Sequence, residues 1–188
     1  MKNWLVGFAA AVALCLVATQ ATAQGASSEA LRFAVEELQV SGRLQLTGAD
    51  VAATALLTEF YERRHFEPVW SRPQQAEELL ALIVASHADG LDPEDYHRAA
   101  VAQSVAALIE ARPMSAAERA ELDILLTDAL VRLAYHQRFG KINPHTLDPQ
   151  WNFRRQLAVS DPDPMTELQA AIDAPSLRRY MEKLIPRG

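Results

Sequence analysis

The segment from Ser115 to Gly140 constrains the fold of this chain more than any other feature. Ser115-x-x-Glu118 is a capping box, in which two side chains bond main-chain N–H groups left free at the start of a helix. Gly140 is typical of a residue that ends a helix. One face of the segment carries an apolar stripe made of Leu122, Leu126, Ala129, Leu130 and Leu133. A long helix with such a stripe must pack against other elements, so we expect it to be central together with the helix that carries Tyr61, both packed with the Asp89–His97 turn.

The remaining sequence also favours helices, since Ala, Leu, Glu, Gln and Arg dominate and no stretch alternates at period two for long. Start and stop signals predict four more helices: one from Ser27 and Ser28 to Gly42, one from the capping box Thr47-Gly48-Ala49-Asp50 to near Pro68, one from Pro73 to Gly90, and one from Asp92-Pro93-x-Asp95 to near Pro113. Two short helices are predicted at Met165–Ile172 and Leu177–Leu184. The predicted fold class is all-α: a single compact multi-helix domain that follows a cleaved signal peptide.

The first residues have the pattern of a secretory signal peptide. Lys2 precedes an uncharged, almost wholly apolar run from Trp4 to Ala18, and Ala21-Thr22-Ala23 is a small-x-small cleavage pattern. We expect cleavage after Ala23 and a periplasmic location. The alternatives are an uncleaved anchor and a lipoprotein modified at Cys15, although the run is short for a membrane span and Leu14 is large for a lipobox. The predicted divisions are a signal peptide (1–23), a helix with a connector (24–46) and a helical domain (47–188).

Charge and cysteine content exclude several functions. The formal net charge is −6, which disfavours nucleic acid as a partner because neutralising phosphates requires a basic face. Cys15 is the only cysteine and lies in the expected signal peptide, so the mature chain has none for a thiol nucleophile or a zinc site. No two of the five histidines have the i, i+4 spacing of a helical metal pair. We therefore expect no cofactor, no metal, and no stable membrane span after cleavage.

No nucleophile or phosphate-binding motif is present: the chain lacks Gly-x-Ser-x-Gly, Ser-x-x-Lys and a glycine-rich loop. Asp123 and Asp128 could form the carboxylate pair of a glycoside hydrolase. However, five residues apart on a helix, they point in different directions. Arg119 and Arg132 lie four residues from Asp123 and Asp128 respectively, so ordinary i, i+4 ion pairs explain both carboxylates.

Two further clusters could bind ligands. Asp92, Asp95 and His97 could act on protons or hold a metal, but the Asp-Pro-x-Asp spacing favours helix capping. Aromatic residues could stack on sugar rings, but core packing is the favoured interpretation for them. The candidate binding residues, all with a structural role preferred, are Tyr61, Arg64, Trp70, Asp95, Tyr96, His97 and Trp151. We expect Trp70 and Tyr96 to be at least half buried, and Arg64 to bind carbonyls or a carboxylate.

Four blocks resemble a known family when they are taken in order. They are Phe60-Tyr61-x-x-Arg64-x-x-x-Pro68-x-Trp70, then Asp89-Gly90-Leu91-x-Pro93-x-Asp95-Tyr96-His97, then Leu122-Asp123-x-Leu125-Leu126-Thr127-Asp128-Ala129, then Gly140-Lys141-Ile142-Asn143-Pro144 followed by Trp151. The set, over roughly residues 50–185, resembles the N-terminal scaffold domain of large multi-domain L,D-transpeptidases of Gram-negative bacteria. Those periplasmic enzymes cross-link peptidoglycan stem peptides.

The resemblance implies a helical fold and a peptidoglycan setting, but not activity. In that family a peptidoglycan-binding module and a catalytic domain follow the scaffold, and the catalytic cysteine lies in a Ser/His-x-Gly-Cys-type motif. No such motif occurs in these 188 residues. The sequence thus predicts a non-catalytic scaffold whose partner is peptidoglycan or a periplasmic cell-wall enzyme. A truncated L,D-transpeptidase without activity of its own and a carboxylate-based peptidoglycan hydrolase remain as alternatives.

Overall fold

The computed structural model describes residues 25–42, 44–46, 48–51, 53–141 and 163–184. The expected signal peptide, including Cys15, and the candidate Trp151 lie outside these residues. The described residues are mainly helical and form one compact domain, which confirms the predicted all-α class. No helix among them is both long enough and apolar enough to span a bilayer.

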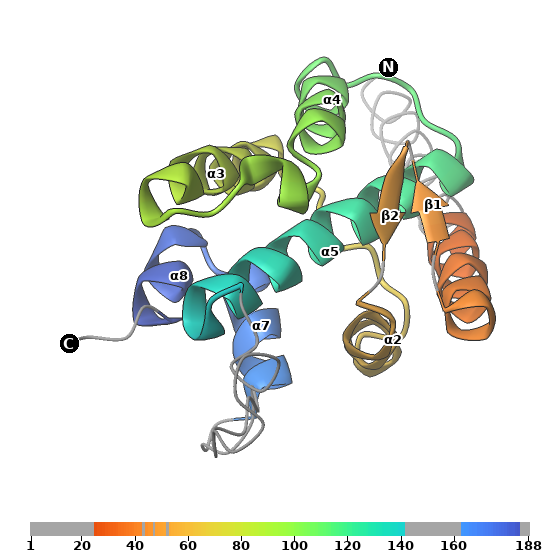
Figure 1. Cartoon of the computed structure of the whole chain (residues 1–188). Coiled ribbons are helices and arrows are strands. Elements are labelled where there is room, and N and C mark those ends of the chain that lie inside the picture. Colours follow the sequence, from red (N-terminus) through yellow and green to blue (C-terminus); the bar gives the residue numbers. More distant parts are fainter. Residues whose placement is uncertain (1–24, 43, 47, 52, 142–162, 185–188) are drawn as a thin grey trace, which may run out of the picture.

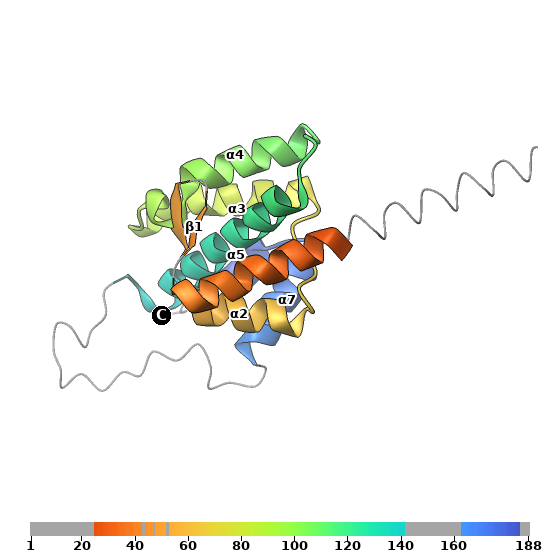
Figure 2. The same cartoon turned by 90° about the vertical axis from the view of Figure 1, so that its right-hand side faces the viewer.

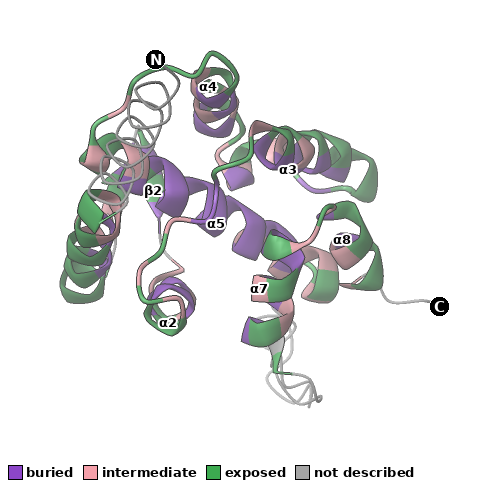
Figure 3. Cartoon of the chain, turned by 180° about the vertical axis from the view of Figure 1, so that it is seen from behind, coloured by how far each residue is buried: buried purple, intermediate pink, exposed green. Residues whose placement is uncertain are grey.

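Helix α5 (Ala116–Phe139) runs through the middle of the molecule (Figures 1 and 3). It begins with the predicted capping box, in which Ser115 Oγ accepts the N–H of Glu118 and the Glu118 carboxylate accepts the N–H of Ser115. Gly140 follows its last residue. The predicted stripe is buried, but so is every other residue from 122 to 131. The centre of α5 is therefore covered on all sides rather than on one face.

Shorter helices surround α5. They are a helix at residues 25–41, α2 (Thr54–Arg63), α3 (Pro73–Ala85), α4 (Arg98–Ile109), α7 (Pro164–Asp173) and α8 (Arg178–Leu184), with the 3₁₀ turns η1 (Ser86–Asp89) and η2 (Pro93–Tyr96) between α3 and α4. Leu31, Val35 and Leu38 attach the first helix to the common core. Pro73 occupies the first turn of α3, as predicted, and the left-handed Gly90 ends η1. Figure 2 shows the 25–41 helix lying beside α2.

A small hairpin replaces one predicted helix start. Strands β1 (Leu44–Leu46) and β2 (Ala49–Val51) pair antiparallel, and Gly48 between them has a φ of 80°. The expectation that Thr47-Gly48-Ala49-Asp50 caps a helix was therefore wrong, because α2 begins at Thr54 without a side-chain cap. Leu46, Ala49 and Val51 are buried, so the alternating apolar residues give this short segment a better core contact as a strand.

The segment after Asp92 is divided where one helix was predicted. Asp92 caps the start of η2, since its Oδ1 accepts the N–H of Glu94 at 3.0 Å. His97 then adopts a left-handed conformation, with a φ of 56°, and α4 begins only at Arg98. Asp95 does not cap the helix but pairs with Lys141, with 2.5 Å between Oδ2 and Nζ. The capping prediction was thus correct for Asp92 and wrong for Asp95.

Candidate functional site

Three polar residues of α5 lie at the centre of the molecule. Asp123, Thr127 and Asp128 are each fully buried among the leucines of the helix. A carboxylate or hydroxyl removed from water costs free energy unless it is hydrogen-bonded, so each needs partners from the surrounding elements. The partners come from the segment that contains Tyr61 and Trp70 and from His97, which both belong to the sequence blocks described above.

Asp123 binds the segment that connects α2 with α3. Its Oδ2 accepts the main-chain N–H groups of Val69 at 3.0 Å and Trp70 at 3.1 Å. Its Oδ1 accepts the hydroxyl of Tyr61 at 3.0 Å. These bonds hold a non-helical stretch of backbone, whose N–H groups have no helical acceptors, against the middle of α5.

Thr127 lies one turn further along α5 and completes this cluster. Its Oγ1 accepts the indole N–H of Trp70 at 2.9 Å and lies 2.7 Å from the Tyr61 hydroxyl. It also donates to the main-chain carbonyl of Asp123 at 2.8 Å. The polar ends of two buried aromatic side chains therefore meet on one threonine, while their rings fill the core. Trp70 and Tyr61 are both fully buried, so core packing is confirmed over an open sugar-stacking surface.

Burial sets the protonation of this cluster. It raises the pKa of Asp123 to about 6, although hydrogen bonds from Trp70, Val69 and Tyr61 favour the charged form. Burial, and then the negative charge of Asp123, raise the pKa of Tyr61 well above its usual value. Tyr61 therefore stays protonated and can donate to the carboxylate throughout the physiological range.

The raised pKa of Asp123 predicts a specific pH dependence of stability. The folded state holds the proton more tightly than the unfolded state, so the contribution of Asp123 is greatest below pH 4 and is lost as the pH rises to about 6. A shift of this size corresponds to roughly 3 kcal/mol. We expect the free energy of unfolding of the wild type, minus that of Asp123→Asn, to fall by about this amount between pH 4 and pH 7. Urea unfolding of both proteins measures it, and a constant difference would contradict the prediction.

Asp128 forms a second cluster on the other side of α5. Its Oδ2 lies 2.8 Å from Nε2 of His97 and 2.7 Å from Nε of Arg132, and its Oδ1 accepts the N–H of Ala53 at 3.2 Å. Arg132 also donates to the main-chain carbonyl of Asp50 at 2.6 Å. One carboxylate therefore joins the end of the hairpin, the start of α4 and α5.

The predicted i, i+4 ion pairs are confirmed for one carboxylate only. Arg132 pairs with Asp128 as expected. Arg119 instead donates to the main-chain carbonyl of Trp70 at 2.6 Å, and Asp123 takes its partners from outside α5. Such i, i+4 pairs are typical of solvated helix faces, whereas both carboxylates are fully buried and need hydrogen-bond partners from other elements.

The candidate binding residues Arg64 and Tyr96 make contacts elsewhere in the domain. Both guanidinium Nη atoms of Arg64 bond the two carboxylate oxygens of Asp173, at 2.9 and 3.1 Å, which confirms the expected carboxylate partner. Tyr96 is fully buried, as predicted, and its hydroxyl lies 3.0 Å from Nδ1 of His136. Burial and the nearby Asp95 and Asp92 raise the pKa of Tyr96 to about 12. None of these contacts belongs to the Asp123 cluster.

The arrangement is suited to holding elements together. A carboxylate that acts on a glycosidic bond must reach the substrate, and neither Asp123 nor Asp128 is exposed. In the part of the chain that the structure describes, no group of three or more His, Cys, Asp or Glu could hold a metal ion.

Thr127 was not named as a candidate functional residue in the analysis of the sequence. The available signal was its place in Leu122–Val131, where seven of the ten residues are apolar, so a polar residue there is expected to be buried and hydrogen-bonded.

The sequence blocks thus correspond to structural contacts. Tyr61 and Trp70 from the first block meet Asp123 and Thr127 from the third, and His97 from the second meets Asp128. A family model described as Scaffold domain matches residues 55–188, which contain all four blocks. No curated protein and no solved structure matches the chain. The family match covers well over half of the sequence, and the chain belongs to the Scaffold domain family.

Proposed function

We propose that this chain is a non-catalytic docking domain of the periplasmic machinery that cross-links peptidoglycan, related to the scaffold of the large L,D-transpeptidases. Membership in the Scaffold domain family supports a role in assembly. The connection to L,D-transpeptidases rests on the four ordered blocks, and export rests on the signal-peptide pattern.

One observation carries the non-catalytic part of the proposal. The polar residues that define the blocks bind one another inside the domain: Asp123 with Tyr61 and Trp70, and Asp128 with His97. A catalytic group must contact its substrate, so enclosed residues of this kind serve the fold instead. The motif then specifies a rigid helical body that presents its outer surface to partners.

The buried carboxylates also argue against the hydrolase alternative. Retaining and inverting glycosidases both place two carboxyl groups on either side of an accessible bond. Here the two carboxylates on α5 have no exposed surface. Pure protein is expected to produce no clearing on a peptidoglycan zymogram, and a cleared band would overturn the non-catalytic assignment.

Binding to the cell wall tests the docking role directly. Protein purified from the periplasm is mixed with purified sacculi and centrifuged, and we expect it to sediment with them but to stay in solution without them. A parallel pull-down uses a purified periplasmic L,D-transpeptidase. The Asp123→Ala variant, which we expect to be strongly destabilised, shows whether binding requires the intact fold. Binding to neither target would contradict the proposal and favour a truncated enzyme without a function of its own.

A further inference from the structure

A groove lies between the 25–41 helix and α2, which run side by side in Figures 1 and 2. Its volume is about 450 Å³, within the range of sites that take small ligands or several side chains of a peptide. Its lining residues are Gln39 from the first helix and Thr54, Ala55, Thr58, Glu59 and Glu62 from α2. Three of the lining residues from α2, namely Thr54, Ala55 and Thr58, have small side chains.

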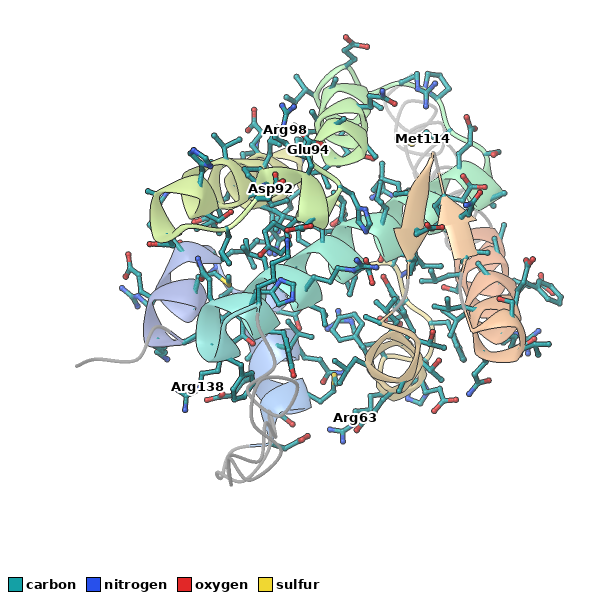
Figure 4. The ribbon with its side chains drawn as sticks, in the orientation of Figure 1. Arg63, Asp92, Glu94, Arg98, Met114 and Arg138 are labelled. Atoms are coloured by element: carbon teal, nitrogen blue, oxygen red, sulfur yellow. The ribbon has the colours of Figure 1, made fainter. Side chains whose placement is uncertain are left out.

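The charge in the groove is negative and only partly compensated. Both charged lining residues are glutamates. Glu59 pairs with Arg63 at 2.5 Å, and Arg63 also binds Asp163. Figure 4 shows Arg63 at the outer edge of α2, pointing away from the body of the molecule. Among the described residues, the carboxylate of Glu62 has no ion-pair or hydrogen-bond partner.

A second, independent feature lies one helical turn from Glu62. Thr58 lines the groove and is only 7% exposed, yet its Oγ1 has no hydrogen-bond partner. A buried hydroxyl without a partner costs free energy, which a ligand that bonds it would recover. Residues four apart on a helix share one face, so the hydroxyl and the carboxylate lie on the same side of α2, although Thr58 Oγ1 is itself enclosed in the observed rotamer. Threonine on a helix has two accessible χ1 rotamers, which lets this hydroxyl turn toward a ligand.

We propose that this groove binds a basic side chain, lysine or arginine, from a segment of a partner protein. The cation pairs with Glu62 and bonds the hydroxyl of Thr58, while its aliphatic stem lies on Ala55. Because the groove is open to solvent along α2, the partner's neighbouring residues continue along it. The inference goes beyond the proposed function, since it assigns a groove and the chemistry of the group that it takes.

Peptide titration followed by NMR tests the groove. The labelled protein is titrated with a blocked Ala-Lys-Ala peptide and with the same peptide carrying norleucine, which has no charge. We expect shifts at Gln39 and across residues 54–62, and binding of the lysine peptide at least about 5-fold tighter than that of the norleucine peptide. Glu62→Gln and Thr58→Val are each expected to weaken lysine binding about 3- to 10-fold.

The matched control is Glu182→Gln, which removes an exposed glutamate from α8 and should leave binding unchanged. Equal affinity for the two peptides, shifts at other acidic surfaces, or undiminished binding by Glu62→Gln would each overturn the assignment. Sedimentation of Glu62→Gln with sacculi separates the two proposals. If wild type and variant both sediment but the peptides do not bind, the groove assignment alone fails. If the peptides bind but no protein sediments or captures the transpeptidase, the docking role in the cell wall fails.

Discussion

Asp123→Ala is expected to lower the free energy of unfolding by about 3–5 kcal/mol at pH 7, a large fraction of the roughly 5–15 kcal/mol that stabilises an ordinary domain. The substitution leaves the N–H groups of Val69 and Trp70 and the hydroxyl of Tyr61 without their acceptor. Each unsatisfied buried donor costs about 1–3 kcal/mol, and the missing carboxylate also leaves a cavity. Urea unfolding followed by circular dichroism measures the loss.

The matched control is Asp123→Asn, which keeps the shape and one carbonyl oxygen. That oxygen can accept from Val69 and Trp70, while the amide NH₂ can donate to the Tyr61 hydroxyl, which then donates to Thr127. We expect a loss of no more than about 1–2 kcal/mol at pH 7, because the amide also avoids burying a charge. If Asp123→Ala were as stable as Asp123→Asn, the carboxylate would not anchor the α2–α3 connection.

The sequence was most informative where a local rule and the tertiary packing agree. The capping box at Ser115 and Glu118 and the ending at Gly140 set the bounds of α5, and the structure has both. The aromatic pair Tyr61 and Trp70 was expected in the core because large rings are buried for their area, and both are fully buried. These features depend on nearest neighbours or on residue type, which a single sequence contains.

It was least informative where partners come from distant parts of the chain. Asp123 is separated by more than fifty residues from each of Tyr61, Val69 and Trp70, so its nearby Arg119 seemed the obvious partner. The left-handed His97 follows from the Asp128 contact and the turn into α4, which no local rule specifies. Likewise, the alternation in Leu44–Leu46 and Ala49–Val51 covers only three residues in each strand, too few to predict a hairpin, and the pairing depends on the core beneath it.

The two clusters on α5 hold different parts of the fold. Asp123 and Thr127 fix the α2–α3 connection, and Asp128 fixes the hairpin end and the start of α4. A helix that carries one polar residue toward each neighbour specifies how those neighbours are arranged, whereas an apolar helix would allow them to slide. The polar residues of these clusters thus fix how the surrounding helices are arranged on α5.

Asp128→Ala is expected to lower the free energy of unfolding by about 3–5 kcal/mol, with a local signature that Asp123→Ala does not share. It removes the partner of His97 and Arg132 and leaves the N–H of Ala53 without an acceptor. In hydrogen exchange at low denaturant, we expect the amides of β1, β2 and Val101, whose N–H donates to the His97 carbonyl at the start of α4, to lose protection before those of α7 and α8.

The comparison with Arg132→Ala decides whether the Asp128 carboxylate itself or its ion pair with Arg132 stabilises the junction of the hairpin with α4. Arg132 is partly exposed, so its removal should cost only about 1–2 kcal/mol and should leave the His97–Asp128 contact in place. If Arg132→Ala were as destabilising as Asp128→Ala, the arginine and its bond to the Asp50 carbonyl would hold the hairpin instead. If exchange accelerated uniformly in Asp128→Ala, the carboxylate would support the whole domain rather than the junction of the hairpin with α4. We expect a large loss of stability in which protection from exchange is lost first at that junction, because the buried Asp128 carboxylate accepts from three donors, His97, Arg132 and Ala53, that come from different parts of the fold.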